Sequence, residues 1–151
     1  MKELEKIISS TSNISDTKAA VISIFHINNY IKETILTHLK PHDLSIEQFN
    51  VMRILRGQKG NPLNLQDIQE RMINKMSNTT RLVDKLLKKR FVKRTICKQN
   101  RRKVEISITE LGLKTLNDLD AVIDNTEQNI TAPLNNEELK QLNKLLLKLN
   151  N

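Results

Sequence analysis

The stretch Asn64–Gly112, NLQDIQERMINKMSNTTRLVDKLLKKRFVKRTICKQNRRKVEISITELG, decides the fold of this 151-residue chain. Its first half spaces apolar residues by three and four, the period of a helix, and its second half alternates apolar and polar residues, the period of a strand. The pattern predicts a helix over 65–72 capped by Asn64, a turn at 73–75, a helix over about 76–89, and strands over 92–96 and 104–108. This order predicts a winged helix-turn-helix, mainly α with a small β-hairpin wing.

The helix expected over 76–89 has two different faces. At about 100° per residue, Thr79, Leu82, Val83 and Leu86 fall on one arc. The opposite arc is polar and mostly basic, and it holds Ser77, Arg81, Asp84, Lys85 and Lys88. One face is therefore expected to pack on the protein while the other stays available to a partner.

Positive charge is concentrated in the same stretch. Between Lys75 and Lys103 there are 12 Lys or Arg and one acid, Asp84, so the local charge is 12 − 1 = +11, against +8 for the whole chain. Clustered cations are stabilised on nucleic acid because they release counterions condensed on the phosphates. Double-stranded DNA is the expected partner, and a solvated helix face with a basic loop is the alternative interpretation.

The flanks predict further helices. A wide apolar face over about 16–39 predicts a long helix that Pro41 ends. Ser45 with Gln48 forms a capping box, and Leu44 can pack on Phe49, so a helix begins there and ends near Gly57 or Gly60. Thr109 caps a helix from Glu110 to about Ile130, Pro133 breaks it, and Asn135 with Glu138 opens a last helix through Leu149.

The chain length fits one compact protomer of three segments. We expect an N-terminal dimerisation segment over 1–40, a winged helix-turn-helix over 44–109 and C-terminal dimerisation helices over 110–151. With 3% aromatic residues and no Trp, a monomer has a thin core, which favours an oligomer.

Several classes of protein are disfavoured. One cysteine, Cys97, excludes an internal disulfide, and with three scattered His it gives no metal-ligand spacing, so no metal or other cofactor is expected. Three Gly without a phosphate-binding loop and no catalytic set argue against an enzyme. No apolar run approaches ~18 residues, so a cytoplasmic, nucleoid-associated protein is expected.

The residues in the basic stretch resemble the MarR (multiple antibiotic resistance regulator) family of bacterial transcription regulators. The resemblance covers about 16–150 and rests on three segments: Asn78–Leu86, Phe91–Arg94, and Asn100-Arg101-Arg102 ahead of Thr109-Glu110-Leu111-Gly112. It implies a homodimeric repressor on a palindromic operator, with recognition helices about 34–36 Å apart.

The resemblance also implies which residues bind DNA. Arg81 is the expected bidentate contact to guanine and Lys88 a phosphate contact. The full set is Ser77, Asn78, Thr80, Arg81, Lys85 and Lys88 on the helix and Arg101, Arg102 and Lys103 on the wing. Solvation is the alternative for Lys85, Lys88 and Lys89, and a bracing ion pair is the alternative for Arg102.

Two positions depart from the family pattern. Asn100 replaces an aspartate that commonly pairs with a wing arginine, which makes the tip more basic and less braced. Arg90 stands where the family usually places Gly to end the recognition helix in a left-handed conformation. Arg90 must therefore accept strain, or the helix must end differently.

Family members commonly respond to small aromatic acids bound between the dimer helices and the winged lobe. His26 and Tyr30 are candidates for lining such a site, and a place in the core or the dimer interface is the alternative for both. Cys97 is a candidate redox switch beside basic neighbours, against the alternative of a packing residue. A zinc sensor lacks a ligand cluster.

Other functions use the same charges. A sequence-tolerant architectural or DNA-coating protein is the main alternative, although Ser77, Asn78 and Thr80 beside Arg81 favour base readout. A membrane-surface protein is a further alternative, but the basic helix lacks the Trp- or Phe-rich face that such helices use.

Overall fold

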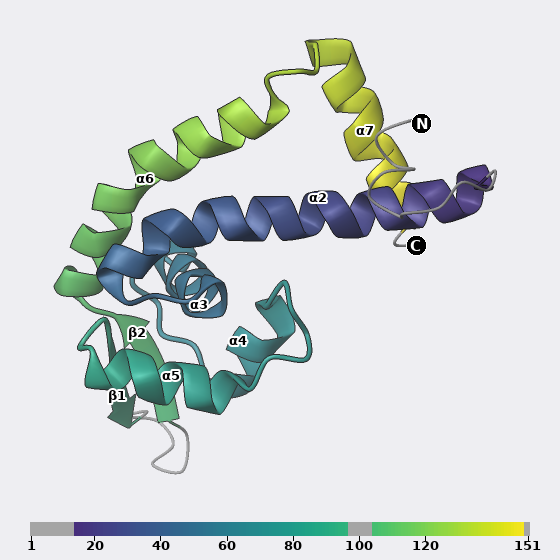
Figure 1. Cartoon of the computed structure of the whole chain (residues 1–151). Coiled ribbons are helices and arrows are strands. Elements are labelled where there is room, and N and C mark those ends of the chain that lie inside the picture. Colours follow the sequence, from purple (N-terminus) through teal and green to yellow (C-terminus); the bar gives the residue numbers. More distant parts are fainter. Residues whose placement is uncertain (1–13, 97–103, 150–151) are drawn as a thin grey trace. The chain divides into compact units, whose positions relative to one another are not determined.

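The computed structural model of the chain describes residues 14–96 and 104–149 (Figure 1). By its internal contacts the chain divides into two units, residues 1–34 and 35–151. The elements are α2 (Asp16–Leu39), the 3-10 turn η1 (Lys40–His42), α3 (Ile46–Gly57), α4 (Leu65–Arg71), α5 (Thr79–Lys88), β1 (Val92–Ile96), β2 (Val104–Ile108), α6 (Glu110–Thr131) and α7 (Asn136–Leu149).

The predicted fold class is confirmed: the protein is mainly α with one antiparallel hairpin, in winged helix-turn-helix order. The hairpin pairs Val92 with Ile108 and Ile96 with Val104. Leu63 forms a single antiparallel β-bridge with Ile106. The Leu63 nitrogen lies 2.9 Å from Ile106 O, and the Ile106 nitrogen lies 2.7 Å from Leu63 O. In Figure 1 the helix-turn-helix α4–α5 lies beside this hairpin, and α4 and α5 both contact it.

The predicted helix starts form because side chains satisfy free backbone N–H groups there. At α3, Ser45 Oγ accepts from the Gln48 N–H at 3.1 Å and Gln48 Oε1 accepts from the Ser45 N–H at 3.1 Å, which confirms the capping box. Asn64, Thr109 and Asn135 cap α4, α6 and α7 in the same way.

The start of α5 differs from the prediction of a helix beginning near Met76. Asn78 Oδ1 accepts from the Arg81 N–H at 3.0 Å, so the helix starts at Thr79. Upstream, Asn74 Oδ1 accepts from the Met76 N–H at 3.1 Å and holds that segment in a turn. Ser77 and Asn78 consequently lie ahead of the helix rather than in its first turn.

The core of the second unit joins every element of the winged lobe. Thr79, Val83 and Leu86 of α5 are buried as predicted, while Leu82 is half-buried. The large side chains with almost no exposed surface include Leu39, Met52, Leu55, Ile68, Met72, Leu86, Ile106, Leu116 and Leu119. None of the helices described is long and apolar enough to cross a lipid bilayer.

Two polar contacts join α6 to earlier elements. The Arg56 guanidinium on α3 donates to both oxygens of Asp120 on α6, at 2.7 and 2.9 Å. On α6, the Thr126 hydroxyl donates to Val122 O at 2.7 Å, so in its 3.2 Å contact with His38 the ring Nε2 is the donor. Both pairs are far apart in sequence, and neither was expected.

Arg90, the residue expected to accept strain or end the helix differently, lies just after the end of α5. Its φ is +60°, in the left-handed region. The Arg90 N–H donates to Leu87 O at 3.0 Å and the Phe91 N–H donates to Leu86 O at 3.1 Å. These two bonds form a Schellman motif, so Arg90 accepts the conformation that Gly adopts at lower cost.

The Thr109-x-x-Gly112 segment fits against Arg90 and Phe91, the last two residues of this motif. Thr109 Oγ1 accepts from the Gly112 N–H at 3.1 Å and donates to Arg90 O at 2.7 Å, and the Thr109 N–H donates to Phe91 O at 3.0 Å. A Cβ on Gly112 would lie 2.3 Å from Phe91 O and 2.8 Å from Ile108 Cγ1. Glycine is therefore required here for close approach of two backbones.

Gly112→Ala should lower the free energy of unfolding by roughly 1–3 kcal/mol, because the new methyl overlaps the Phe91 carbonyl. Gly57→Ala is the control: a methyl group on Gly57 would have no neighbouring atom within 4 Å, so this replacement should gain about 0.5 kcal/mol. Urea denaturation of both variants checks this, and equal stabilities would contradict the assigned role of Gly112.

Arg90→Gly should raise the free energy of unfolding by about 0.5–1 kcal/mol, since glycine removes the cost of the left-handed conformation. Arg90→Ala removes the same charge and keeps the strain, so it should give no gain. Thermal melts compare the two variants, and an equal gain in both would show that charge rather than backbone conformation sets the difference.

Candidate nucleic-acid interface

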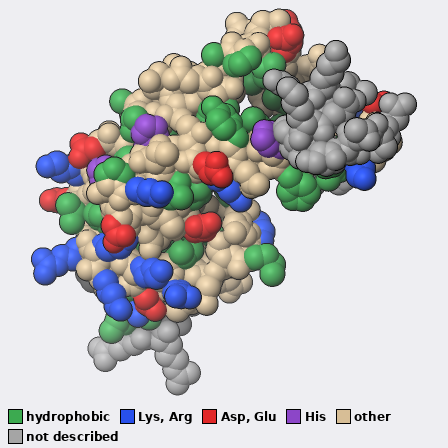
Figure 2. Space-filling view, in the orientation of Figure 1, with side chains coloured by type: hydrophobic (Ala, Val, Ile, Leu, Met, Phe, Trp, Pro, Cys, Tyr) green, Lys and Arg blue, Asp and Glu red, His purple; other side chains and the backbone are tan. Residues whose placement is uncertain are grey.

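Basic side chains gather on the winged lobe. In Figure 2, several Lys and Arg side chains lie on the lobe built by α3, α4, α5 and the hairpin, interspersed with acidic and hydrophobic side chains. On α5, Arg81, Lys85 and Lys88 are exposed and have no ion pair among the residues described. These three cations are free to meet an external anion.

The N-terminal end of α5 presents polar groups beside Arg81. Thr80 and Asn78 are exposed, and the Asn78 oxygen is used in the helix cap. The Ser77 hydroxyl oxygen is shielded from solvent and has no hydrogen-bond partner in the described structure. Of the helix residues predicted to face DNA, all but Ser77 therefore expose their side chains.

The turn between α4 and α5 is held by side-chain hydrogen bonds. The Thr79 hydroxyl donates to Gln69 Oε1, and Gln69 Nε2 donates to Lys75 O at 2.7 Å. From α3, Asn50 Oδ1 accepts from the Ile73 N–H at 3.0 Å. Gln69 and Asn50 were not singled out from the sequence, because only the folded turn brings them to these backbone groups.

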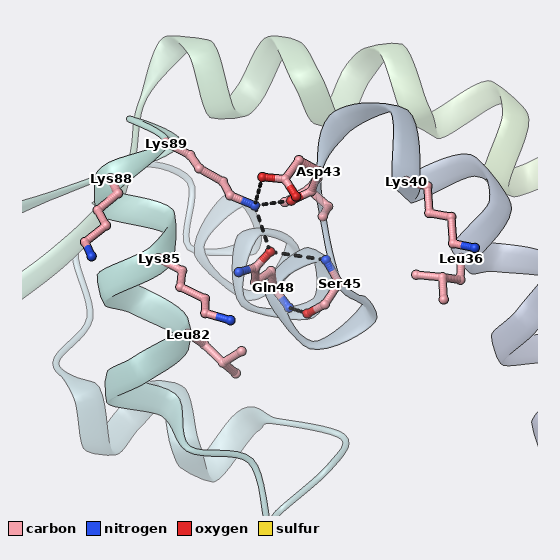
Figure 3. Close-up of a pocket in the computed structure, with 10 residues that line it drawn as sticks. Leu36, Lys40, Asp43, Ser45, Gln48, Leu82, Lys85, Lys88 and Lys89 are labelled. Carbon is pink, nitrogen blue, oxygen red and sulfur yellow. Dashed lines mark hydrogen bonds and ion pairs between the residues drawn. The ribbon is translucent and has the colours of Figure 1, made fainter.

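Lys89 has a structural contact rather than a free, solvated side chain. Its ammonium lies 2.9 Å from Asp43 Oδ2, donates to the Asp43 backbone oxygen, and lies 3.4 Å from Gln48 Oε1 (Figure 3). The hydrogen bond and charge of Lys89 lower the pKa of the Asp43 carboxyl. Lys89 thus ties the end of α5 to the start of α3.

Asp84, the single acid in the basic stretch, is also paired. Its Oδ1 lies 3.2 Å from Arg94 Nη2, which joins α5 to β1. The pair is partly exposed, so it contributes little to stability. The pair joins α5 to β1 at the base of the hairpin.

A cleft of about 550 Å³ lies beside these contacts. Figure 3 shows Lys85 extending into it from α5, with Lys88 further along α5 and its ammonium turned away, Lys40 and Leu36 on the opposite side, and Leu82 beside Lys85. His26 and Tyr30, the residues suggested for a ligand site, are exposed on α2, and other residues line this cleft.

The predicted wing-tip contacts Arg101, Arg102 and Lys103 lie outside the described residues, as do Asn100 and Cys97. Within residues 14–96 and 104–149, no three His, Asp or Glu side chains converge to hold a metal ion.

Comparison with known proteins agrees with this architecture. Residues 44–104 match the model of the MarR family. An HTH-type transcriptional regulator of Bacillus subtilis, YfiV, is 39% identical over 72 residues, which span 48% of this chain and 44% of that protein. The chain thus matches less than half the length of this curated relative.

Solved structures are similar over most of the chain. A MarR transcription factor from Planctomyces limnophilus is 28% identical with a TM-score of 0.68, covering 89% of this chain and 98% of that one. A mutant of E. coli MarR complexed with operator DNA is 21% identical with a TM-score of 0.77, covering 91% of this chain and 99% of that one. The winged helix-turn-helix over residues 44–104 thus matches the MarR family, and the fold of most of the chain is similar to that of solved MarR regulators.

Proposed function

We propose that this protein is a sequence-specific, DNA-binding transcription regulator that acts as a homodimer. The observation that carries the proposal is the exposed set Asn78, Thr80 and Arg81 at the fixed start of α5, backed by Lys85 and Lys88. Hydrogen-bonding groups at a helix N-terminus can read base edges in the major groove, while cations further along the helix contact phosphates.

The roles of the helix residues follow from their surroundings. Arg81 is exposed, unpaired among the described residues, and its backbone is fixed by the Asn78 cap, so its planar guanidinium is available for bidentate contact with guanine O6 and N7. Lys85 and Lys88 lie one and two turns further on and are the phosphate contacts. Arg101, Arg102 and Lys103 of the wing complete the proposed DNA-binding set.

The homodimer is supported by apolar surface that the protomer leaves uncovered. Every leucine of α7 after Leu139 is exposed, and α7 has no fully buried residue. On α2, Val21, Ile24, Phe25 and Tyr30 are also exposed. Surfaces of this kind are stabilised by a second copy, so 1–40 and 110–151 remain the proposed dimerisation segments.

The basic cleft supports regulation by a small molecule. Lys40, Lys85 and Lys88 surround it without an ion pair among the described residues, so a small organic anion is the class of effector it favours. Because Lys85 and Lys88 belong to the recognition helix, an anion there competes with DNA phosphates for the same cations. A repressor that the anion releases from DNA in this way would allow transcription when the anion is present.

The alternative is an architectural protein that coats DNA without reading sequence. The cations alone serve both functions, whereas the exposed Thr80 hydroxyl and the Asn78 amide beside Arg81 can also address base edges, which favours readout. The E. coli MarR structure with operator DNA supports the reading function for this fold.

Fluorescence anisotropy over a salt series, on DNA upstream of the coding region and on scrambled DNA, tests the proposal. Sequence-specific regulation predicts a preference of ~10³-fold or more that persists as salt rises. Arg81→Ala should cost roughly 1–3 kcal/mol on the preferred DNA and little on scrambled DNA, while Lys88→Ala should weaken both alike. If the protein does not prefer the upstream DNA to scrambled DNA, binding sites selected from random duplexes take the place of the upstream DNA in the assay.

Equal losses for Arg81→Ala on both DNAs would refute its role as a base contact. A protein that selects no sequence from random duplexes would be a coating protein.

Leu142→Glu combined with Leu146→Glu should dissociate the dimer, because both charges would be buried at the proposed interface. Lys144→Glu changes a charge on the opposite arc of the same exposed helix, about 160° from both Leu142 and Leu146, and should leave the mass unchanged. Light scattering measures all three proteins, and a dimer that persists in the double variant would place the interface elsewhere.

A further inference from the structure

The turn between α4 and α5 carries two unusually exposed apolar side chains. Met76 is 92% exposed and Ile73 is 85% exposed, the two highest values among the large hydrophobic residues described. Single exposed apolar residues are ordinary on protein surfaces. This pair differs because it lies immediately ahead of the Asn78 cap, at the end of α5 that is proposed to enter DNA.

The two exposed side chains lie on a turn whose backbone is held by hydrogen bonds. The Ile73 N–H donates to Asn50 Oδ1 at 3.0 Å, and the Met76 N–H donates to Asn74 Oδ1 at 3.1 Å. The Ser77 N–H donates to Asn74 O at 3.2 Å. The turn is therefore held at three points, and its apolar side chains face outward as part of the fold.

The charges around Met76 and Ile73 indicate which kind of partner can cover these two side chains. Lys75 and Arg81 flank it and are exposed, so the apolar spot lies in a positive setting. An apolar protein surface would have to desolvate these cations, which is costly. DNA offers phosphates to the cations and, on base edges in the major groove, the 5-methyl group of thymine to the apolar side chains.

Resting on the proposed function, we propose that Met76 and Ile73 read thymine by packing on its 5-methyl group. An unbranched thioether side chain adapts to small apolar groups, which suits Met76 to this contact. Arg81 and Thr80 then read hydrogen-bonding groups while the turn reads methyl groups, so each half-site carries thymines next to the guanine bound by Arg81.

Uracil substitution tests this contact, because it removes the methyl group and leaves base pairing unchanged. Binding sites are first selected from random duplexes with the full chain, and each thymine of a half-site is then replaced singly by uracil. The unaltered protein should lose roughly fourfold in affinity at each contacted thymine. Met76→Ala or Ile73→Ala should lose a similar factor on thymine DNA and show no further loss with uracil at the matching position.

Leu111→Ala provides the control, since Leu111 is also an exposed apolar residue but lies on α6. This variant should keep the full sensitivity to uracil. Circular dichroism should show unchanged folding in all three variants because the side chains removed are largely exposed.

Three outcomes would overturn the inference. The first is that uracil weakens binding at no position, and the second is that uracil lowers the affinity of the Met76 and Ile73 variants as much as that of the unaltered protein. The third is that the Met76 and Ile73 variants differ from the unaltered protein in mass when free in solution. The last outcome assigns the pair to a contact between protein copies. Failure of the proposed function is separate, since it appears earlier as the absence of any selected sequence.

Discussion

The backbone of Phe91 is the point on which the winged lobe depends. Its N–H closes the Schellman motif of α5 at Leu86 O, and its carbonyl accepts from the backbone N–H of Thr109, the residue that caps α6. The same carbonyl lies where a side chain on Gly112 would be. The backbone of one residue thus takes part in the end of α5, the start of the hairpin and the start of α6, so these three elements are tied to one another.

In the same part of the protein, some Lys and Arg side chains form ion pairs and others do not. Arg56, Lys89 and Arg94 each have an acidic partner on another segment, and each pair joins two elements of the lobe. Arg81, Lys85 and Lys88 have none among the residues described. Partly exposed pairs contribute little to stability, so their main consequence is geometric: the Lys89 and Arg94 pairs tie α5 to its neighbours while its remaining cations stay unpaired, and the Arg56 pair joins α3 to α6. The resulting field attracts a polyanion to one face of the lobe.

The sequence predicted what local chemistry determines. Caps at Ser45, Asn64, Thr109 and Asn135 were predicted correctly because each depends on residues within one turn. The start of α5 was misplaced because Met76 continues a helical pattern that the Asn74 turn and the Asn78 cap interrupt. The pairing of Arg56 with Asp120 spans 64 residues, and the lysine cleft joins α2, α3 and α5, so neither has a local signal. The roles of the DNA-binding residues remain predictions, and those of the wing tip lie outside the described structure.

The cap of α5 also restricts what its own residue can recognise. An asparagine that reads adenine in the usual bidentate manner must accept a hydrogen bond from N6 and donate one to N7. The Asn78 oxygen already accepts from the Arg81 N–H, so one of its two lone pairs is used and the cap holds the amide in one orientation. While it caps the helix, Asn78 keeps its NH₂ group available to acceptor atoms such as guanine O6 or N7, adenine N7 and thymine O4. A residue whose first task is to begin a helix can thus meet a base only in the orientation that the cap allows.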